Sequence, residues 1–185
     1  MSVTNPDFKL LGFADEAGDT IQEQIRATKE LGWTCIEARS INVTNLTDIP
    51  DEAFESVQAA LASAGFRIDC FGSAVANWAK DPRSEEDFHI KDVRFIRPTE
   101  TIFNDLDHCW PGEGEGKVAE VLREALVSGF KGTFSIEPHL ASVYHAPGGE
   151  HKQCDPYASY VEYGRRTMAL LDKARLASES GSAML

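Results

Sequence analysis

The stretch LLGFADEAGDTIQEQIRATKELGWTCIEA, residues 10–38, decides the fold class of this chain. It begins with a short apolar run at 10–14, and Asp19 and Thr20 then supply a capping signal for a helix. Apolar positions recur every three to four residues from Ile21 to Gly32, which predicts an amphipathic helix before a second apolar run. Strand, helix and strand in this order indicate a βαβ unit and therefore a parallel sheet.

The same alternation continues toward the middle of the chain and then breaks. Pro50 opens a second predicted helix that ends at Gly65, and residues 67–71 form a third strand. Residues 77–87 are polar and carry no apolar stripe. A short strand over 88–93 follows them without the helix that a crossover between parallel strands requires.

The second half resumes the pattern. We predict a helix from residue 118 to Gly129, a strand over 133–137 and a last helix that opens at Asp155 and Pro156. The chain is therefore predicted to be α/β, with about five βα units.

Length and charge narrow the classes of function. The chain has 185 residues, enough for one domain, but an eight-stranded β/α barrel typically takes about 250. A net charge of −12 repels phosphate backbones and anionic lipid, so we expect neither nucleic acid nor membrane as a partner. The start carries no signal-peptide pattern and no apolar run reaches about 18 residues, so we expect a cytoplasmic protein. We assign residues 1–176 to one domain and 177–185 to a disordered tail.

Several acidic residues and one histidine lie at predicted strand ends. Glu137 closes its strand just before a proline, where a carboxylate can bind a divalent cation or move a proton; an ordinary loop glutamate is the alternative. His89 lies on a strand, where a hydrogen-bonded core histidine is the more common case. Asp15 and Glu16 close the first strand and Glu37 lies near the end of the second, and we expect solvated strand ends there.

Two further patterns carry less weight. Residues 111–116, PGEGEG, precede a helix and could direct N–H groups toward an anion, but they lack the Lys-Ser/Thr of a phosphate loop, so we predict a flexible turn. His139, His145 and His151 recur at six-residue intervals. Neither a helix nor a strand brings such positions onto one face, and we expect loop histidines.

Five segments carry more specific motifs. They are Gly12-Phe-Ala-Asp-Glu-Ala17, Ile36-Glu-Ala-Arg39, His89-Ile-Lys-Asp-Val-Arg94, Pro111-Gly-Glu-Gly114 and Phe134-Ser-Ile-Glu-Pro138. Together they resemble, in this order, the first, second and seventh strands, the following loop and the eighth strand of the sugar phosphate isomerase/epimerase family, which belongs to the xylose isomerase-like TIM barrel superfamily.

The resemblance implies isomerisation or epimerisation of a small sugar or polyol. It also implies a divalent metal, Mn²⁺ or Mg²⁺, held at the carboxyl ends of four strands by two glutamates, an aspartate and a histidine. His89 and Glu137 match two of these metal ligands, and Glu137 also matches a glutamate that transfers the substrate proton. Glu37 and Arg94 are implied as substrate contacts.

The chain departs from the family in one place. No segment matches strands four to six, which supply the other catalytic glutamate and the metal-binding aspartate, and the apparent deletion lies near residues 87–89. We therefore expect a partial barrel whose activity is impaired, because two of four ligands make a weak metal site. An in-frame deletion, an error of gene assembly and a natural remnant would each produce this order.

Two other functions remain open from sequence. A non-catalytic partial barrel would expose sheet edges and apolar surface, which favour a homo-oligomer or another partner. The DNA-repair endonucleases of the same superfamily are the least favoured comparison, since the chain is strongly acidic.

Overall fold

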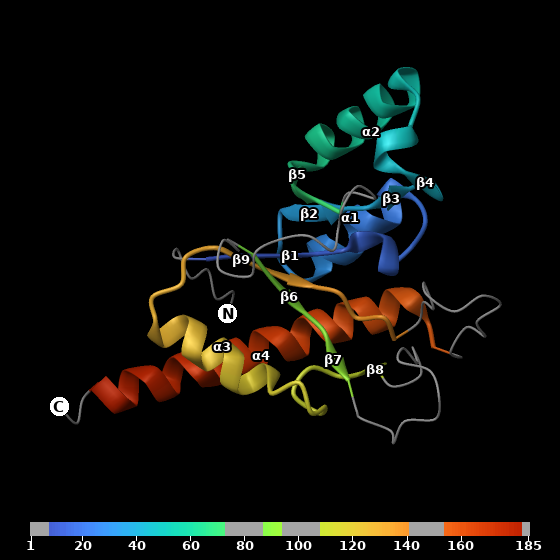
Figure 1. The fold of residues 1–185 in the computed structure, drawn as a ribbon. Helices are drawn as coiled ribbons and strands as arrows, with labels where there is room; N and C mark the ends of the chain where they lie inside the picture. Colours follow the sequence, from blue (N-terminus) through green and yellow to red (C-terminus); the bar gives the residue numbers. More distant parts are fainter. Residues whose placement is uncertain (1–7, 73–86, 94–107, 141–153, 183–185) are drawn as a thin grey trace.

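The computed structural model describes residues 8–72, 87–93, 108–140 and 154–182 (Figure 1). The elements of the first half are β1 (Lys9–Gly12), η1 (Ala14–Glu16), α1 (Ile21–Glu30), β2 (Cys35–Ala38), β3 (Ser40–Ile41), β4 (Thr44–Asn45), η2 (Leu46–Asp48), α2 (Asp51–Ala64) and β5 (Arg67–Phe71). Those of the second half are β6 (Asp87–Ile90), β7 (Asp92–Val93), β8 (His108–Cys109), α3 (Val118–Val127), β9 (Thr133–Ile136) and α4 (Pro156–Ser182).

Five of the strands run parallel in one row. β9 pairs with β1 on one side and with β6 on the other, and β2 pairs with β5. A parallel bridge between Phe13 and Glu37 joins the two groups, so the order is β5–β2–β1–β9–β6. The predicted mixed α/β fold with parallel strands is confirmed. The strands in the described part of the chain do not close into a barrel.

The helices begin and end where the sequence places its signals. Thr20 caps α1 through a capping box, in which its Oγ1 accepts from the Glu23 N–H and Glu23 Oε2 accepts from the Thr20 N–H. Gly65 ends α2 with a φ of 73°, a left-handed conformation that glycine adopts without steric cost. Asp155 Oδ1 accepts two backbone N–H groups at the start of α4. The three predicted boundaries are therefore confirmed.

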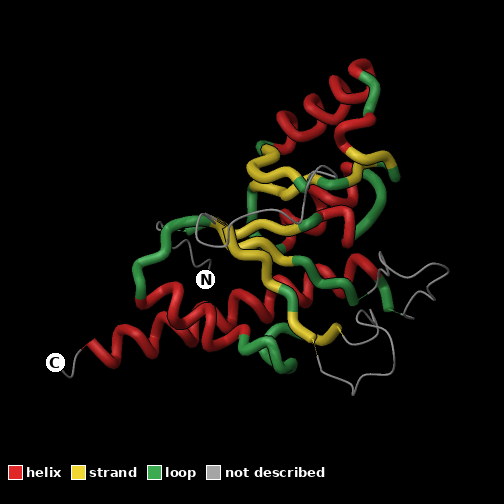
Figure 2. The backbone as a smooth tube through the Cα atoms, viewed as in Figure 1, coloured by secondary structure: helices red, strands yellow, loops and turns green. Residues whose placement is uncertain are grey.

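The helices form a layer that follows the order of the strands. α1 contacts α2 and α4, and α4 contacts α3, so the layer runs α2–α1–α4–α3. Figure 2 shows α3 and α4 side by side next to the strands. The core lies between the two layers, and its fully buried side chains include Ile36, Phe134, Ile136 and Tyr160.

The structure differs from the predicted elements in three places. The expected loop after β2 contains the antiparallel hairpin β3–β4, because Asn42 and Val43 both adopt positive φ as a tight hairpin turn requires. The predicted strand over 88–93 is divided into β6 and β7, and β7 pairs antiparallel with β8. α4 runs to Ser182, beyond residue 176, where we expected the domain to end.

No helix in the described ranges combines the length and the apolar character needed to cross a membrane.

Candidate active site

Charged and acid/base side chains gather where the parallel strands end. Because β1, β2, β6 and β9 run in the same direction, their carboxyl ends share one edge of the sheet. Sites in parallel α/β folds form at this edge. The residues that follow the strand ends and contact one another are Asp15, Glu16, Arg39, Lys91, Glu137 and His139.

Glu137 is the first residue after β9, and its backbone N–H donates to the Ile90 carbonyl at 3.1 Å. The two oxygens of its carboxylate have different partners. Oε1 lies 2.8 Å from His139 Nε2, and Oε2 lies 2.8 Å from Lys91 Nζ. Burial would raise the pKa of Glu137, but the hydrogen bond from His139 and the positive charge of Lys91 outweigh it and lower the pKa to about 2. Glu137 is therefore ionised at neutral pH.

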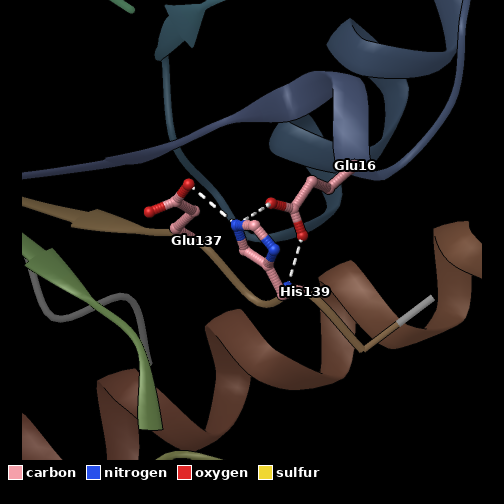
Figure 3. A group of neighbouring side chains, drawn as sticks. All are labelled: Glu16, Glu137 and His139. Carbon is pink, nitrogen blue, oxygen red and sulfur yellow. Dashed lines mark hydrogen bonds and ion pairs between the residues drawn. The ribbon is translucent and has the colours of Figure 1, made fainter. Parts of the chain in front are cut away.

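His139 lies between Glu137 and Glu16, as Figure 3 shows, and its side chain is completely buried. Its φ of 51° lies in the left-handed region, which few non-glycine residues adopt. In this conformation its backbone N–H donates to Glu16 Oε2 at 2.7 Å. Burial lowers the pKa of His139, although the hydrogen bond to Glu137 acts in the opposite direction, so the imidazole is neutral at pH 7.

Glu16 is the most deeply buried acid of the site, with 2% of its side chain exposed. Oε1 has no hydrogen-bond partner among the described residues and lies 3.8 Å from His139 Nε2 and 3.6 Å from Arg39 Nη2. Burial raises the pKa of Glu16 to about 8, against the opposing charge of Arg39. The two glutamates beside His139 thus have pKa values displaced in opposite directions, an arrangement typical of acid/base sites.

Arg39 connects three strand ends. Its guanidinium forms a two-point ion pair with Asp15, at 2.9 and 3.1 Å, and its Nη1 lies 3.5 Å from Glu137 Oε1. The guanidinium also lies over the Phe13 ring, 4.6 Å from its centroid. Its side chain is 20% exposed and that of Lys91 is 31% exposed, so both cations can meet a ligand from solvent.

The glycine-rich loop before α3 is fixed by an internal anion. Asp92 is completely buried, and its carboxylate accepts from the N–H groups of Gly112, Gly114 and Gly116 at 2.8, 3.0 and 3.1 Å. The loop does direct N–H groups toward an anion, but the anion belongs to the protein. The segment is a turn, as predicted, and its N–H groups are held by the Asp92 carboxylate.

The predicted site residues lie in different surroundings. Glu137 lies in the cluster, whereas the buried Glu37 carboxylate accepts from the Ser135 hydroxyl and from Cys70 Sγ. His89 occupies the register position beside Ser135, in the pairing of β6 with β9. Arg94 lies outside the described residues. The proposed roles of Glu37, His89 and Arg94 therefore stay predictions.

The expectation of solvated strand ends is wrong for Asp15, Glu16 and Glu37, whose carboxylates are buried. Asp15 and Glu16 are not solvated, because the short helix η1 turns both carboxylates inward toward Arg39 and His139. His139 lies in a loop, as expected, but its ring is fully buried between two glutamates. Its place two residues after Glu137, just beyond the same strand end, is the signal that could have identified it. The six-residue spacing of His139, His145 and His151 gave no indication of this role. His145 and His151 lie outside the described residues.

Comparisons with protein-family models, with curated proteins and with solved structures found no match for this chain. The function proposed below therefore depends on the geometry of the cluster, on the strand order and on the motifs in the sequence.

Proposed function

We propose that this chain binds a divalent metal ion and a small sugar or polyol at the carboxyl ends of its parallel strands, as a shortened member of the sugar phosphate isomerase/epimerase family. The observation that carries the proposal is the meeting of Glu16, Glu137 and His139 with two partly exposed cations, Arg39 and Lys91, at this edge. Acidic, basic and neutral imidazole groups in one place are the requirements for moving a proton at a carbon beside a carbonyl.

The strand order supports the family. In an eight-stranded barrel the first strand lies between the second and the eighth, and the seventh pairs with the eighth. The order β5–β2–β1–β9–β6 corresponds to strands three, two, one, eight and seven. This is the order expected for a barrel that lacks strands four to six, a partial (β/α) barrel.

The residues present fit a divalent cation. Glu137 is ionised at neutral pH, and beside it the buried Oε1 of Glu16 has no hydrogen-bond partner among the described residues. Glu137 would hold the ion, together with the His89 that the resemblance implies. A bound Mn²⁺ or Mg²⁺ supplies Lewis-acid polarisation of a carbonyl or hydroxyl oxygen.

The chain's own residues would orient and deprotonate the substrate. Arg39 and Lys91 donate hydrogen bonds to hydroxyl or carbonyl oxygens, since both side chains reach solvent while they remain paired with carboxylates. Glu137 accepts the proton from the carbon beside the carbonyl. Because strands four to six would supply the second proton-transfer glutamate, we expect slow exchange of this proton rather than full isomerase turnover.

Proton exchange with solvent tests this function without knowledge of the natural substrate. The protein is incubated in D₂O with Mn²⁺ and a panel of aldoses and ketoses, and deuterium beside the carbonyl is measured by NMR. We expect exchange that requires Mn²⁺ and is lost in Glu137→Gln but kept in Glu30→Gln, which changes an exposed glutamate at the end of α1. Exchange no faster than in buffer with every sugar, or unaffected by Glu137→Gln, would refute the proposed reaction.

A non-catalytic, self-associating partial barrel is the second candidate. Among the described strands, β5 and β6 each pair on one side only, and Phe71 at the end of β5 is 41% exposed. Unpaired strand edges with apolar side chains favour association with another chain. Light scattering after size exclusion would show a dimer or larger species on this account, and a monomer at all concentrations would contradict it.

A further inference from the structure

We propose that Glu16 and His139 bind the metal together with Glu137, and that this three-residue site prefers a transition-metal ion such as Mn²⁺ to Mg²⁺. The inference rests on the proposed function, which requires a divalent ion at this edge. Neither Glu16 nor His139 is among the ligands implied by the family resemblance. The two residues would thus supply protein ligands in place of those carried by the missing strands.

The distances allow one ion to reach all three residues. Their candidate donor atoms lie within 4.8 Å of one another, with 2.8 Å between Glu137 Oε1 and His139 Nε2 and 3.8 Å between Glu16 Oε1 and His139 Nε2. With metal–ligand bonds of about 2.1 Å, two donors of one ion can be separated by at most about 4.2 Å. A shift of about half an ångström therefore closes the longest gap.

The backbone holds Glu16 in position for this role. Its Oε2 accepts a hydrogen bond from the backbone N–H of His139 at 2.7 Å. The other oxygen, Oε1, remains directed at the imidazole and has no hydrogen-bond partner in the described part of the chain. Arg39 Nη2 lies 3.6 Å from this oxygen, too far for a hydrogen bond, and burying a carboxylate oxygen without a hydrogen bond is costly. A role limited to bracing the His139 backbone would require only Oε2, whereas a metal ligand requires Oε1.

The donor set and the neighbouring charges decide which ion binds. Metal ligands must be deprotonated, so Glu16 releases its proton when the ion binds. Two carboxylates and an imidazole then suit Mn²⁺ and its heavier neighbours, whereas Mg²⁺ prefers oxygen donors and keeps several waters. Arg39 and Lys91 lie within 3.6 Å of the carboxylate oxygens and repel any cation. An ion that gains little from the imidazole cannot offset this repulsion, so Mg²⁺ should bind weakly.

Metal binding by the full chain, measured by calorimetry without substrate, tests the ligand set. The chain is first freed of metal with EDTA and then titrated with Mn²⁺ or Mg²⁺. We expect Mn²⁺ to bind at least about 10-fold more tightly than Mg²⁺, following the general preference of sites with nitrogen donors. Glu16→Gln and His139→Asn should each weaken Mn²⁺ by at least about 10-fold, as the loss of one ligand does. Asn is chosen because it tolerates the left-handed backbone of residue 139, and Glu30→Gln should bind Mn²⁺ as the unmodified protein does.

A second measurement uses only the unmodified protein, so it does not depend on the folding of a variant. Paramagnetic Mn²⁺ should broaden the NMR signals of the His139 ring and of the His108 ring stacked on it at 4.9 Å, at substoichiometric metal.

Binding that is lost in Glu137→Gln but unchanged in Glu16→Gln and His139→Asn would overturn this inference and leave the proposed function standing. Absence of binding by any divalent ion would overturn both, and Mg²⁺ binding as tight as Mn²⁺ would overturn the stated preference.

Discussion

The replacement Glu16→Gln should make the metal-free protein more stable at neutral and alkaline pH. The pKa of Glu16 is raised to about 8 in the folded protein, from an ordinary value of 4.5 in the unfolded chain. Below pH 4.5 both states hold the proton, and the buried carboxyl contributes its full stability. As the pH rises toward 8 the unfolded chain releases this proton while the folded protein keeps it, so stability is lost across this window.

The size of the effect follows from the displacement of the pKa. A difference of one pKa unit corresponds to 1.36 kcal/mol, so the displacement from 4.5 to about 8 amounts to about 5 kcal/mol of lost stability once the pH exceeds the folded pKa. Gln carries no ionisable proton and resembles the protonated carboxyl in shape. The free energy of unfolding of Glu16→Gln, relative to the unmodified protein, should therefore rise steadily between pH 5 and pH 8 and level off above it.

Urea unfolding at several pH values, in the presence of EDTA, measures this difference directly. Glu30→Gln serves as the control, because it also removes one acidic group but from an exposed position at the end of α1. A stability difference for Glu16→Gln that stays constant between pH 5 and pH 8, or that Glu30→Gln reproduces, would refute the account of a buried acid with a raised pKa.

Three further predictions concern the framework that supports the site. Asp92→Asn should destabilise the protein by about 2–3 kcal/mol in urea unfolding, because one of three loop N–H groups loses its acceptor and the other two lose a charged acceptor. The control Asp155→Asn preserves a helix cap and should be nearly neutral. Equal effects of the two replacements would contradict this prediction. Gly12→Ala should lower the free energy of unfolding by about 1–3 kcal/mol, because the new Cβ would lie 2.5 Å from Cγ1 of Ile136. An unchanged midpoint of thermal unfolding would show that β1 and β9 are not so closely packed. Thr20→Ala removes the capping box of α1 and should cost about 1 kcal/mol, while Thr20→Ser should retain most of the stability.

The periodic elements of the fold could be predicted because local signals determine them. The helix from Ile21, the turn at Gly65 and the start at Pro156 each depend on a cap or on backbone conformation, and these act within a few residues. The hairpin after β2 was missed because its turn uses Asn42 and Val43 rather than a glycine pair. The spatial order of the parallel strands was not predicted, because periodicity identifies strands but not their neighbours in the sheet.

The site was predicted less completely because it depends on tertiary contacts. Glu137 was recognisable from its place at a strand end, but the burial of Glu16 is created by η1, which places its carboxylate against a residue more than a hundred positions away. The role of Asp92 depends on the path of a loop some twenty residues later. Charged residues at strand ends are commonly solvated, and sequence alone does not reveal which of them the fold encloses.

Crystals soaked with Mn²⁺ and measured at an X-ray energy where manganese scatters anomalously would test the central claim most directly. The account predicts a single strong anomalous peak within bonding distance of Glu137, at the carboxyl ends of β1 and β9, with Glu16 and His139 completing its protein ligands. A fully soaked crystal with no peak at this edge, or with its strongest peak elsewhere on the molecule, would contradict it.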